Sequence, residues 1–154
     1  MSIELPSTYK YTNISDGVRS ACLKNPSKIA YKHGNNTRTY YELAQRIDSI
    51  SSVISSFDIP PKSNLAIVAS NSIDYMEIVL AASQLGHPIA TVNPKLTAKE
   101  IVSICEDAQA SLIFVDQKVS TLVEGIHIDG AQRKINIDNE LSNLIDQSSQ
   151  MGGP

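Results

Sequence analysis

Cysteine is scarce in this chain of 154 residues: only Cys22 and Cys105 occur, and both lie in apolar patterns of helical spacing. These patterns exclude a disulfide-stabilised scaffold and a zinc site built on cysteines. A surplus of positive charge is also lacking, because 13 lysines and arginines stand against 16 aspartates and glutamates, which gives a net charge of −3. A dedicated binder of nucleic acids or of anionic membranes is therefore disfavoured.

Long apolar runs are missing as well. No run approaches the roughly 20 residues that a helix needs to cross a bilayer, and residues 1–6 lack the charged and apolar regions of a signal peptide. We therefore expect a reducing, cytoplasmic compartment, with an organelle such as the peroxisome as the alternative. Hydrophobic residues make up 42% of the chain and charged residues 19%, which is typical of one globular domain or a piece of a larger one.

Glycine-rich and catalytic motifs are absent too. The sequence contains no Gly-x-Gly-x-x-Gly fingerprint for a dinucleotide, no Gly-x-Ser-x-Gly elbow and no His-Glu-x-x-His zinc motif. Gly125 and Gly130 have the spacing of a phosphate-binding loop, but Ala131 and Gln132 follow where a lysine and a serine or threonine are required. The motif scan alone therefore indicates no active site, and we predict no catalytic, cofactor-binding or metal-binding residue.

Two groups of polar residues stand near the start of one predicted helix. The loop 70–72 follows an apolar strand, so it is the best candidate for an anion site, although plain capping by Ser72 explains it more simply. Asp74 and Glu77 could form a carboxylate pair. Three residues apart at a helix start, they more simply favour the helix dipole and solvent.

The three histidines, His33, His87 and His127, lie far apart in the sequence and lack the spacing of metal ligands. His33 is interpreted as a turn residue and His127 as part of a solvated segment. His87 precedes a strand, which places it at the sheet edge opposite the one where ligand crevices form, so a structural role is predicted.

Local signals divide the chain into helices and strands. Capping boxes at Thr39 with Glu42 and at Thr97 with Glu100 begin two amphipathic helices. The second helix is expected to direct Ile101, Val102, Ile104, Cys105 and Ala108 inward. An extended lead-in is expected over 1–10, followed by a helix over 14–25 with Asn13 as N-cap. This helix is expected to present Ile14, Val18, Ala21 and Cys22 on one face. The remaining expected elements are a hairpin of 28–32 and 38–40, strands at 65–69, 88–92, 111–115 and 134–137, and helices at 73–85, 119–123 and 141–145.

The alternation of strands and helices over 65–115, with short links, predicts parallel strands joined by crossovers. The run 65–69 is apolar throughout, which fits a strand buried on both faces. We therefore predict an α/β fold, namely a parallel-sheet βαβαβ layer of flavodoxin-like or doubly wound type with an N-terminal helix and a hairpin. Such a layer, as part of a larger fold, should leave an apolar surface and an unpaired strand edge.

An ordered set of short motifs resembles one family. The motifs are Thr39-Tyr40-Tyr41-Glu42-Leu43, Asn64-Leu65-Ala66-Ile67-Val68, Asn71-Ser72, Gly86-His87-Pro88, Val92-Asn93-Pro94, Leu96-Thr97 and Glu100-Ile101. In this order and spacing the chain resembles the N-terminal part of the adenylate-forming (ANL) superfamily, which includes acyl-CoA synthetases and 4-coumarate–CoA ligase-like enzymes. The resemblance covers residues 28–116 and extends more loosely to 146. Ser63-Asn64, Ser70 and His87 depart from the family's usual Gly-Asp, proline and small residue.

The resemblance implies an AMP-binding ligase with a two-step reaction. A carboxylate attacks the α-phosphate of Mg·ATP to give an acyl-adenylate and pyrophosphate, and a thiol, usually that of CoA, then displaces AMP. For the full-length family it implies ATP, magnesium and CoA as cofactors, a carboxylic acid substrate and a setting in fatty acid metabolism. The family's phosphate loop, Tyr-Gly-x-Thr-Glu segment, ribose-binding aspartate and C-terminal-domain lysine are not found in this sequence. Residues 1–146 are expected to be the N-terminal part of an adenylation domain, and 147–154 a linker toward its remainder.

Two hypotheses of different classes stay open. In the first, the chain is the N-terminal segment of an ATP-dependent acid–thiol ligase that is inactive alone, that has the rest of its adenylation domain as partner, and that self-associates through exposed sheet surface. In the second, it is a stand-alone flavodoxin-like binding or interaction module without catalysis, whose C-terminal segment completes the sheet and whose sheet is covered on both faces. A Rossmann-type nucleotide-binding domain is a distant third, because its glycines are missing.

Overall fold

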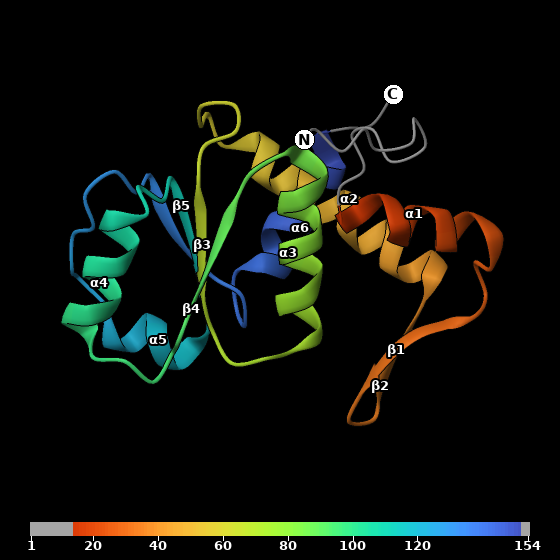
Figure 1. The fold of residues 1–154 in the computed structure, drawn as a ribbon, viewed down its shortest axis with the longest axis horizontal. Coiled ribbons are helices and arrows are strands. Elements are labelled where there is room, and N and C mark those ends of the chain that lie inside the picture. The colour runs from red at the N-terminus through yellow and green to blue at the C-terminus, as the bar shows by residue number, and fades with distance from the viewer. Residues whose placement is uncertain (1–13, 152–154) are drawn as a thin grey trace, which may run out of the picture.

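The computed structural model describes residues 14–151, which form six helices and six strands (Figure 1). The predicted lead-in over 1–10 and the predicted N-cap Asn13 lie outside the described residues. The elements follow the order α1 (Ile14–Lys24), β1 (Ile29–His33), β2 (Asn36–Thr39), α2 (Tyr40–Ser56), β3 (Leu65–Val68), α3 (Ile73–Leu85), β4 (Ile89–Val92), α4 (Ala98–Asp107), β5 (Leu112–Val115), α5 (Gln117–Leu122), β6 (Arg133–Asn136) and α6 (Leu141–Met151).

The main sheet has four strands in the order β4-β3-β5-β6, and every neighbouring pair is parallel. This confirms the predicted α/β class and its parallel strands. The layer is larger than the predicted βαβαβ unit, because α5 and β6 add a further crossover and strand. The predicted hairpin forms a separate antiparallel pair, β1 with β2, beside the helices (Figure 1).

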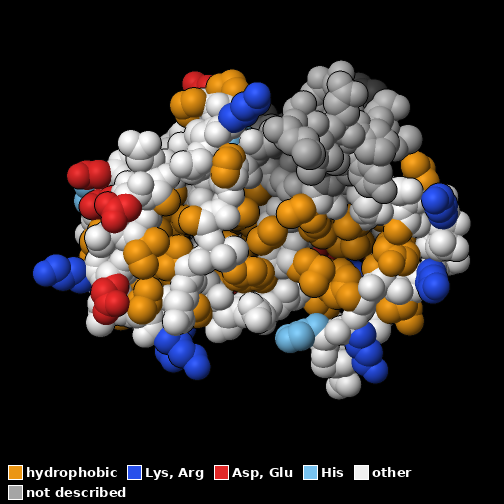
Figure 2. All heavy atoms as spheres, in the orientation of Figure 1, with side chains coloured by type: hydrophobic (Ala, Val, Ile, Leu, Met, Phe, Trp, Pro, Cys, Tyr) orange, Lys and Arg blue, Asp and Glu red, His pale blue; other side chains and the backbone are white. Residues whose placement is uncertain are grey.

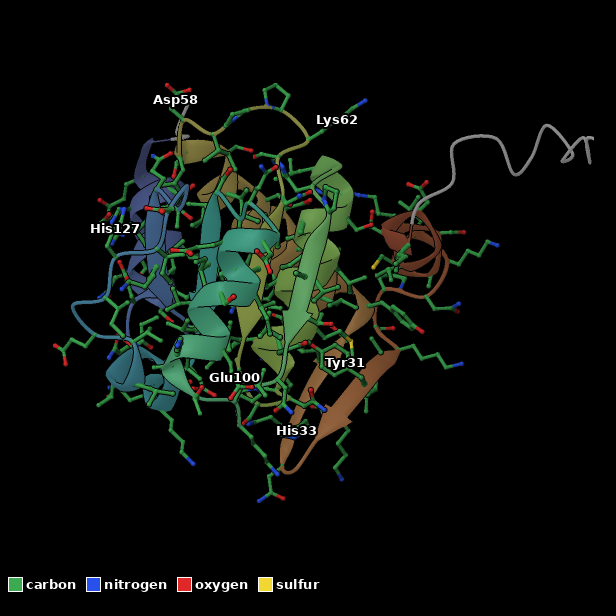
Figure 3. All side chains as sticks on the ribbon, turned by 60° about the vertical axis from the view of Figure 1, so that its left-hand side comes forward. Tyr31, His33, Asp58, Lys62, Glu100 and His127 are labelled. Atoms are coloured by element: carbon green, nitrogen blue, oxygen red, sulfur yellow. The ribbon has the colours of Figure 1, made fainter. Side chains whose placement is uncertain are left out.

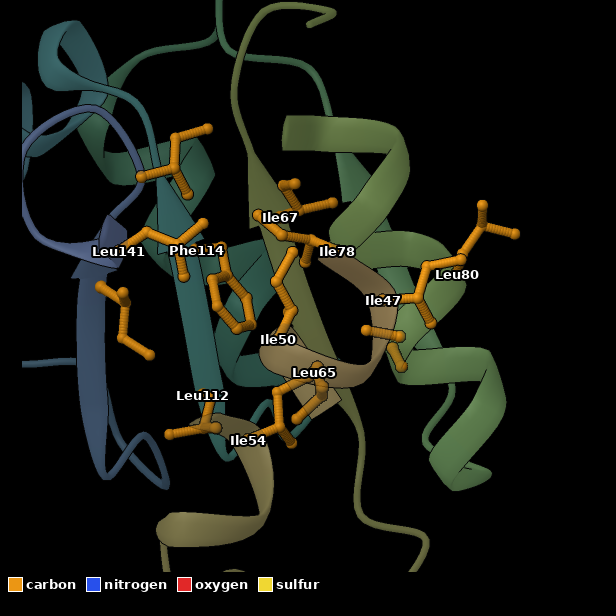
Figure 4. Packing of buried hydrophobic residues seen from close by; sticks show 14 of the residues in the cluster. Ile47, Ile50, Ile54, Leu65, Ile67, Ile78, Leu80, Leu112, Phe114 and Leu141 are labelled. Carbon is orange, nitrogen blue, oxygen red and sulfur yellow. The ribbon is translucent and has the colours of Figure 1, made fainter. Parts of the chain in front are cut away.

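Two apolar cores lie on the two faces of this sheet. Alternate residues of β3 divide between them: Leu65 and Ile67 pack with α2, α3 and α6, whereas Ala66 and Val68 pack with α4 and α5. Figure 4 shows the first core, where Ile50 of α2 and Phe114 of β5 meet over the sheet. All four residues of β3 are buried, which is why the strand reads as a continuous apolar run.

The predicted caps begin and end the helices where the sequence indicates. The Thr39 hydroxyl accepts a hydrogen bond from the Glu42 amide at 3.2 Å, and Thr97 does the same for Glu100 at 3.2 Å. Gly86 ends α3 with φ of 79°, a left-handed conformation that favours glycine. These ends follow from contacts within one helical turn, so neighbouring residues suffice to predict them.

Three details of the helices differ from the prediction. The last helix, α6, runs to Met151, so residues 147–151 are helical instead of irregular, while the domain division at 146 itself stays a prediction. Ile14 is 72% exposed and Ile104 38% exposed, although both fall on faces that their spacing predicts to be apolar.

The longest helix has 17 residues, and in the described part of the chain no helix is long and apolar enough to cross a membrane.

Candidate functional site

A cleft of about 610 Å³ lies at the carboxyl ends of the central strands. The loop 70–72 follows β3 and leads into α3 on one face of the sheet, whereas Asp116 follows β5 and leads into α5 on the other face. Ligands of open α/β sheets bind at such a point, where neighbouring strands send their connections to opposite faces. The cleft is lined by Ser70, Asn71, Ser72, Asp116, Gln117, Lys118, Thr121, Ile137 and Asp138.

Hydrogen bonds to the backbone hold the cleft together. The carboxylate of Asp116 accepts from the amides of Ser70 and Val119, both at 2.9 Å, so it joins the end of β3 to the start of α5. The carboxylate of Asp138 accepts from the Gln117 amide at 2.7 Å and joins the segment after β6 to α5 in the same way. The two carboxylates thus hold together the segments that follow β3, β5 and β6.

The loop 70–72, the best candidate for an anion site, caps a helix. The Ser72 hydroxyl accepts from the Tyr75 amide at 3.1 Å, which confirms the capping interpretation. The carboxylates of Asp116 and Asp138 border the same cleft, and so does Lys118, whose charge is of the opposite sign. Among the described residues no group of three or more His, Cys, Asp or Glu could hold a metal ion.

Replacing Asp116 by alanine is expected to lower the free energy of unfolding by about 2 kcal/mol, because α5 loses its cap and the Ser70 amide loses its acceptor. Urea denaturation followed by circular dichroism measures the change. The matched control is Asp129→Ala, which removes a carboxylate whose partner is the ring of the exposed His127. Equal midpoints for the two variants would contradict the structural role of Asp116.

A second polar cluster surrounds Glu77, and it corrects the prediction that this carboxylate faces solvent. Glu77 is completely buried in α3. Its two oxygens accept from Arg46 Nε of α2 at 2.8 Å, from Arg38 Nε of β2 at 3.1 Å and from the Tyr31 hydroxyl of β1 at 2.9 Å. Arg46 also pairs with Asp74 at 3.0 Å. One buried carboxylate thus ties both strands of the hairpin to α2 and α3.

The electrostatics of this cluster favour a structural role for Glu77. Burial, together with the nearby charge of Glu77, raises the pKa of Tyr31 far above its usual range, so its hydroxyl stays protonated and donates. Burial also raises the pKa of Asp74, against the opposing effect of Arg46. A carboxylate that already accepts from three donors has little capacity left to take a proton from a substrate. The cluster is therefore a tether for the hairpin.

The sequence did not reveal this cluster because the three donors of Glu77 lie 31 to 46 residues before it in the chain. One signal was present. Glu77 is the single charge in the middle of a helix that is otherwise apolar around most of its circumference, with Met76 and Ile78 beside it. A lone charge on a helix covered on several sides requires a partner of opposite charge.

The histidines lie far apart in the structure. Figure 3 shows His33 at the hairpin and His127 on the other side of the molecule, where its side chain is 83% exposed. His87 Nδ1 is 2.8 Å from the Ser63 carbonyl, just before β3 and β4 begin, which fits the predicted structural role at the edge away from the cleft.

The cysteines behave as small apolar residues. Cys105 is fully buried, and this burial raises the pKa of its thiol to about 11, which disfavours the nucleophilic thiolate. Cys22 is only partly buried, and its thiol donates to the Tyr40 carbonyl. The prediction that the chain has no catalytic, cofactor-binding or metal-binding residue stays a prediction.

Comparison with known proteins places this fold among enzymes that bind AMP. The profile of the family described as AMP-binding enzyme matches residues 18–150. Among solved structures, the N-terminal domain of FACL13 from Mycobacterium tuberculosis is 18% identical with a TM-score of 0.81, and the match covers 88% of this chain and 36% of that one. The anthranilate CoA ligase AuaEII in complex with anthranoyl-AMP is 16% identical with a TM-score of 0.84, over 93% of this chain and 28% of that one. These structures show the same fold.

The curated relatives are much longer proteins. The polyketide synthase-nonribosomal peptide synthetase ffsA of Aspergillus flavipes is 28% identical over 72% of this chain and 3% of its own length. The 3-methylmercaptopropionyl-CoA ligase of Ruegeria pomeroyi is 30% identical over 70% of this chain and 20% of its own length. The peroxisomal acetate/butyrate–CoA ligase AAE7 of Arabidopsis thaliana is 28% identical over 68% of this chain and 18% of its own length. The chain therefore spans a fifth or less of each of these relatives.

Proposed function

Because this chain belongs to the family of AMP-binding enzymes, we propose that it is the N-terminal scaffold of an ATP-dependent acid–thiol ligase of the acyl-CoA synthetase kind. The match over residues 18–150 carries the proposal, and two of the relatives named above are CoA ligases. The reaction class is the joining of a carboxylic acid to a thiol by way of an acyl-adenylate. A cytoplasmic setting and a fatty acid substrate are part of the proposal.

In this proposal the described residues supply framework, and the rest of an adenylation domain supplies the chemistry. The sheet and its two cores form a rigid platform, and Glu77 fixes the hairpin against α2 and α3. The carboxylates in the cleft already accept backbone hydrogen bonds, and the sequence has no phosphate loop. ATP, magnesium and CoA are therefore assigned to segments outside these 154 residues.

The purified 154-residue chain is expected to be inactive, because its sequence has no phosphate loop to stabilise a transferring phosphoryl group. The measurement is the exchange of labelled pyrophosphate into ATP with a panel of short, long and aromatic carboxylic acids. A full-length acyl-CoA ligase serves as the positive control. Exchange that depends on any of the acids would show that the chain has adenylating activity of its own.

The coding sequence downstream of codon 154 tests the ligase assignment itself. The proposal expects an open frame that encodes a loop rich in serine, threonine and glycine and ending in Pro-Lys-Gly. A stop codon at that place would favour a module without catalysis.

That second candidate is supported by one specific observation. Strand β6 adds a fourth strand to the sheet, and helices cover both of its faces, as expected for a stand-alone flavodoxin-like module. For such a module we expect a single cooperative transition in differential scanning calorimetry of the isolated chain. A broad transition without a heat-capacity peak would contradict the stand-alone module and favour the proposal that the chain is the scaffold of a ligase.

A further inference from the structure

The two outer strands of the main sheet differ in chemistry. The outer strand β6 carries Arg133 and Lys134 among its four residues. The outer strand β4 has no charged residue and consists of Ile89, Ala90, Thr91 and Val92. Lysine and arginine on an edge strand discourage pairing with another chain, whereas a flat, uncharged edge invites it.

Both cations of β6 are held close to the protein. The Lys134 ammonium donates to the carbonyls of Val123 at 3.0 Å and Ile126 at 2.6 Å. The Arg133 guanidinium lies 5.5 Å from the centre of the Phe57 ring and pairs with Glu140. A strand added along β6 would meet these charges, so this edge is protected.

The edge of β4 has no such protection. Within residues 14–151, β4 pairs only with β3, and the Pro88 carbonyl accepts from the Leu65 amide at 2.8 Å. Because backbone groups alternate sides along a strand, Ala90 faces β3 like Pro88, whereas Ile89 and Thr91 direct their N–H and C=O groups away from the sheet. Two donors and two acceptors thus line the free edge.

The surface around this edge is largely apolar, although Lys32 and His33 of β1 line a hollow together with Met76 and Val79 of α3. In Figure 2 apolar side chains gather over the middle of the face where Figure 1 places β4 and α3, and charged side chains lie toward its margins. Met76, Val79 and Ser83 share one side of α3 at helical spacing, and Met76 is 45% exposed. A second molecule approaching this face meets no charge on β4 or on this side of α3.

We propose that β4 is a docking edge for a second copy of this chain, with the two β4 strands antiparallel across a two-fold axis beside Ala90. In this register Ile89 lies opposite Thr91 of the second copy, and each such pair exchanges two N–H···O=C bonds. The four bonds satisfy the outward groups of both strands and join the two sheets into one.

The edge is self-complementary, which is the reason for choosing a second copy as the occupant. A two-fold interface brings the same patch together with itself, so any charge on it would face its own sign. Here an apolar side chain faces a hydroxyl-bearing one, and Ala90 faces Ala90 across the axis. Residues of such a non-hydrogen-bonded pair have Cα atoms only about 4.5 Å apart, and the small alanine side chain permits that approach.

Sedimentation equilibrium over a range of chain concentrations tests the proposal. The average mass is expected to rise from 16.7 kDa toward twice that value as concentration increases. Thr91→Pro removes one outward N–H without touching the bonds to β3, and Thr91→Lys adds an edge charge, so both variants should stay monomeric. Thr91→Val, which keeps the edge uncharged, should dimerise like the parent chain.

Hydrogen exchange distinguishes this edge from every other surface. The amides of Ile89 and Thr91 are expected to gain protection as concentration rises, while the amides of β6 do not change. A mass that stays at 16.7 kDa at all concentrations overturns the proposal. A dimer that survives in folded Thr91→Lys, or one that protects amides elsewhere but not these two, overturns it as well.

Discussion

Glu77→Gln is expected to lower the free energy of unfolding by about 3 kcal/mol, since removing one charge of a buried ion pair leaves its partners uncompensated. Two guanidiniums are affected, because Arg38 and Arg46 both donate to this carboxylate. Their side chains are 30% and 26% exposed, so water relieves part of the loss, and we expect the lower end of the range typical of buried pairs. Urea denaturation gives the change in free energy.

Control variants separate the buried charge from the chemical substitution. Glu124→Gln makes the same exchange at an exposed position and is expected to change stability by less than about 0.5 kcal/mol. Tyr31→Phe removes one of the three donors and is expected to have an intermediate effect of about 1 kcal/mol.

The hairpin provides a second readout for the Glu77 tether. In Glu77→Gln the amides of β1 and β2 should exchange faster than in the parent chain, because the tether to α3 is weakened. If hairpin exchange is unchanged and the unfolding midpoint matches that of Glu124→Gln, the cluster does not hold the hairpin.

Phe114→Ala is expected to lower the free energy of unfolding by about 4 kcal/mol, the usual effect of deleting a buried ring from a core that cannot collapse around it. Phe114 is completely buried at the centre of β5 and packs in the core between the sheet, α2 and α3 (Figure 4). Rigid elements surround it on all these sides, so the vacated volume should persist. Chemical denaturation with an unchanged slope would show that the loss arises in the native state.

The chain itself offers the matched control, because it has only two phenylalanines. Phe57 is partly buried at the end of α2, beside Arg133. Phe57→Ala makes the same substitution there and is expected to lower stability by only about 1 kcal/mol. Similar losses for the two variants would show that the core relaxes around Phe114, against the rigid packing described above.

Elements whose signals are short in range could be predicted from the sequence. The caps at Thr39, Ser72 and Thr97 depend on hydrogen bonds within about one turn, and all three are confirmed, as are the bounds of the helix predicted over 73–85. The continuous apolar run of β3 predicts burial on both faces for a similar reason. The side-chain alternation of a strand needs no knowledge of distant partners.

Features that depend on distant residues could not be predicted in this way. Leu141, Leu144 and Ile145 of α6 pack in the core with α2 residues, and the helix then continues through mostly exposed polar residues to Met151, beyond the end that its apolar residues indicate. Ile104 has apolar spacing but stays 38% exposed, since the sheet contacts only part of the circumference of α4. Glu77 was predicted to face solvent, because the residues that neutralise it belong to β1, β2 and α2.

The cleft contains one feature that the local sequence predicts and one that depends on distant residues. The loop 70–72 could be recognised as a turn between strand and helix, and its capping role followed from Ser72. That Asp116 would accept from the Ser70 amide could not be foreseen, since this contact requires β3 and β5 to be neighbours.

By itself the sequence determined the α/β class, most of the elements and the resemblance to AMP-binding enzymes, because these rest on local hydrogen bonds, side-chain periodicity and ordered motifs. The tertiary structure alone decided the strand order β4-β3-β5-β6, the burial of Glu77 among its three donors and the contrast between the charged edge of β6 and the uncharged edge of β4. The physical reason is that packing brings together groups dozens of residues apart, and their partners set their burial and charge balance.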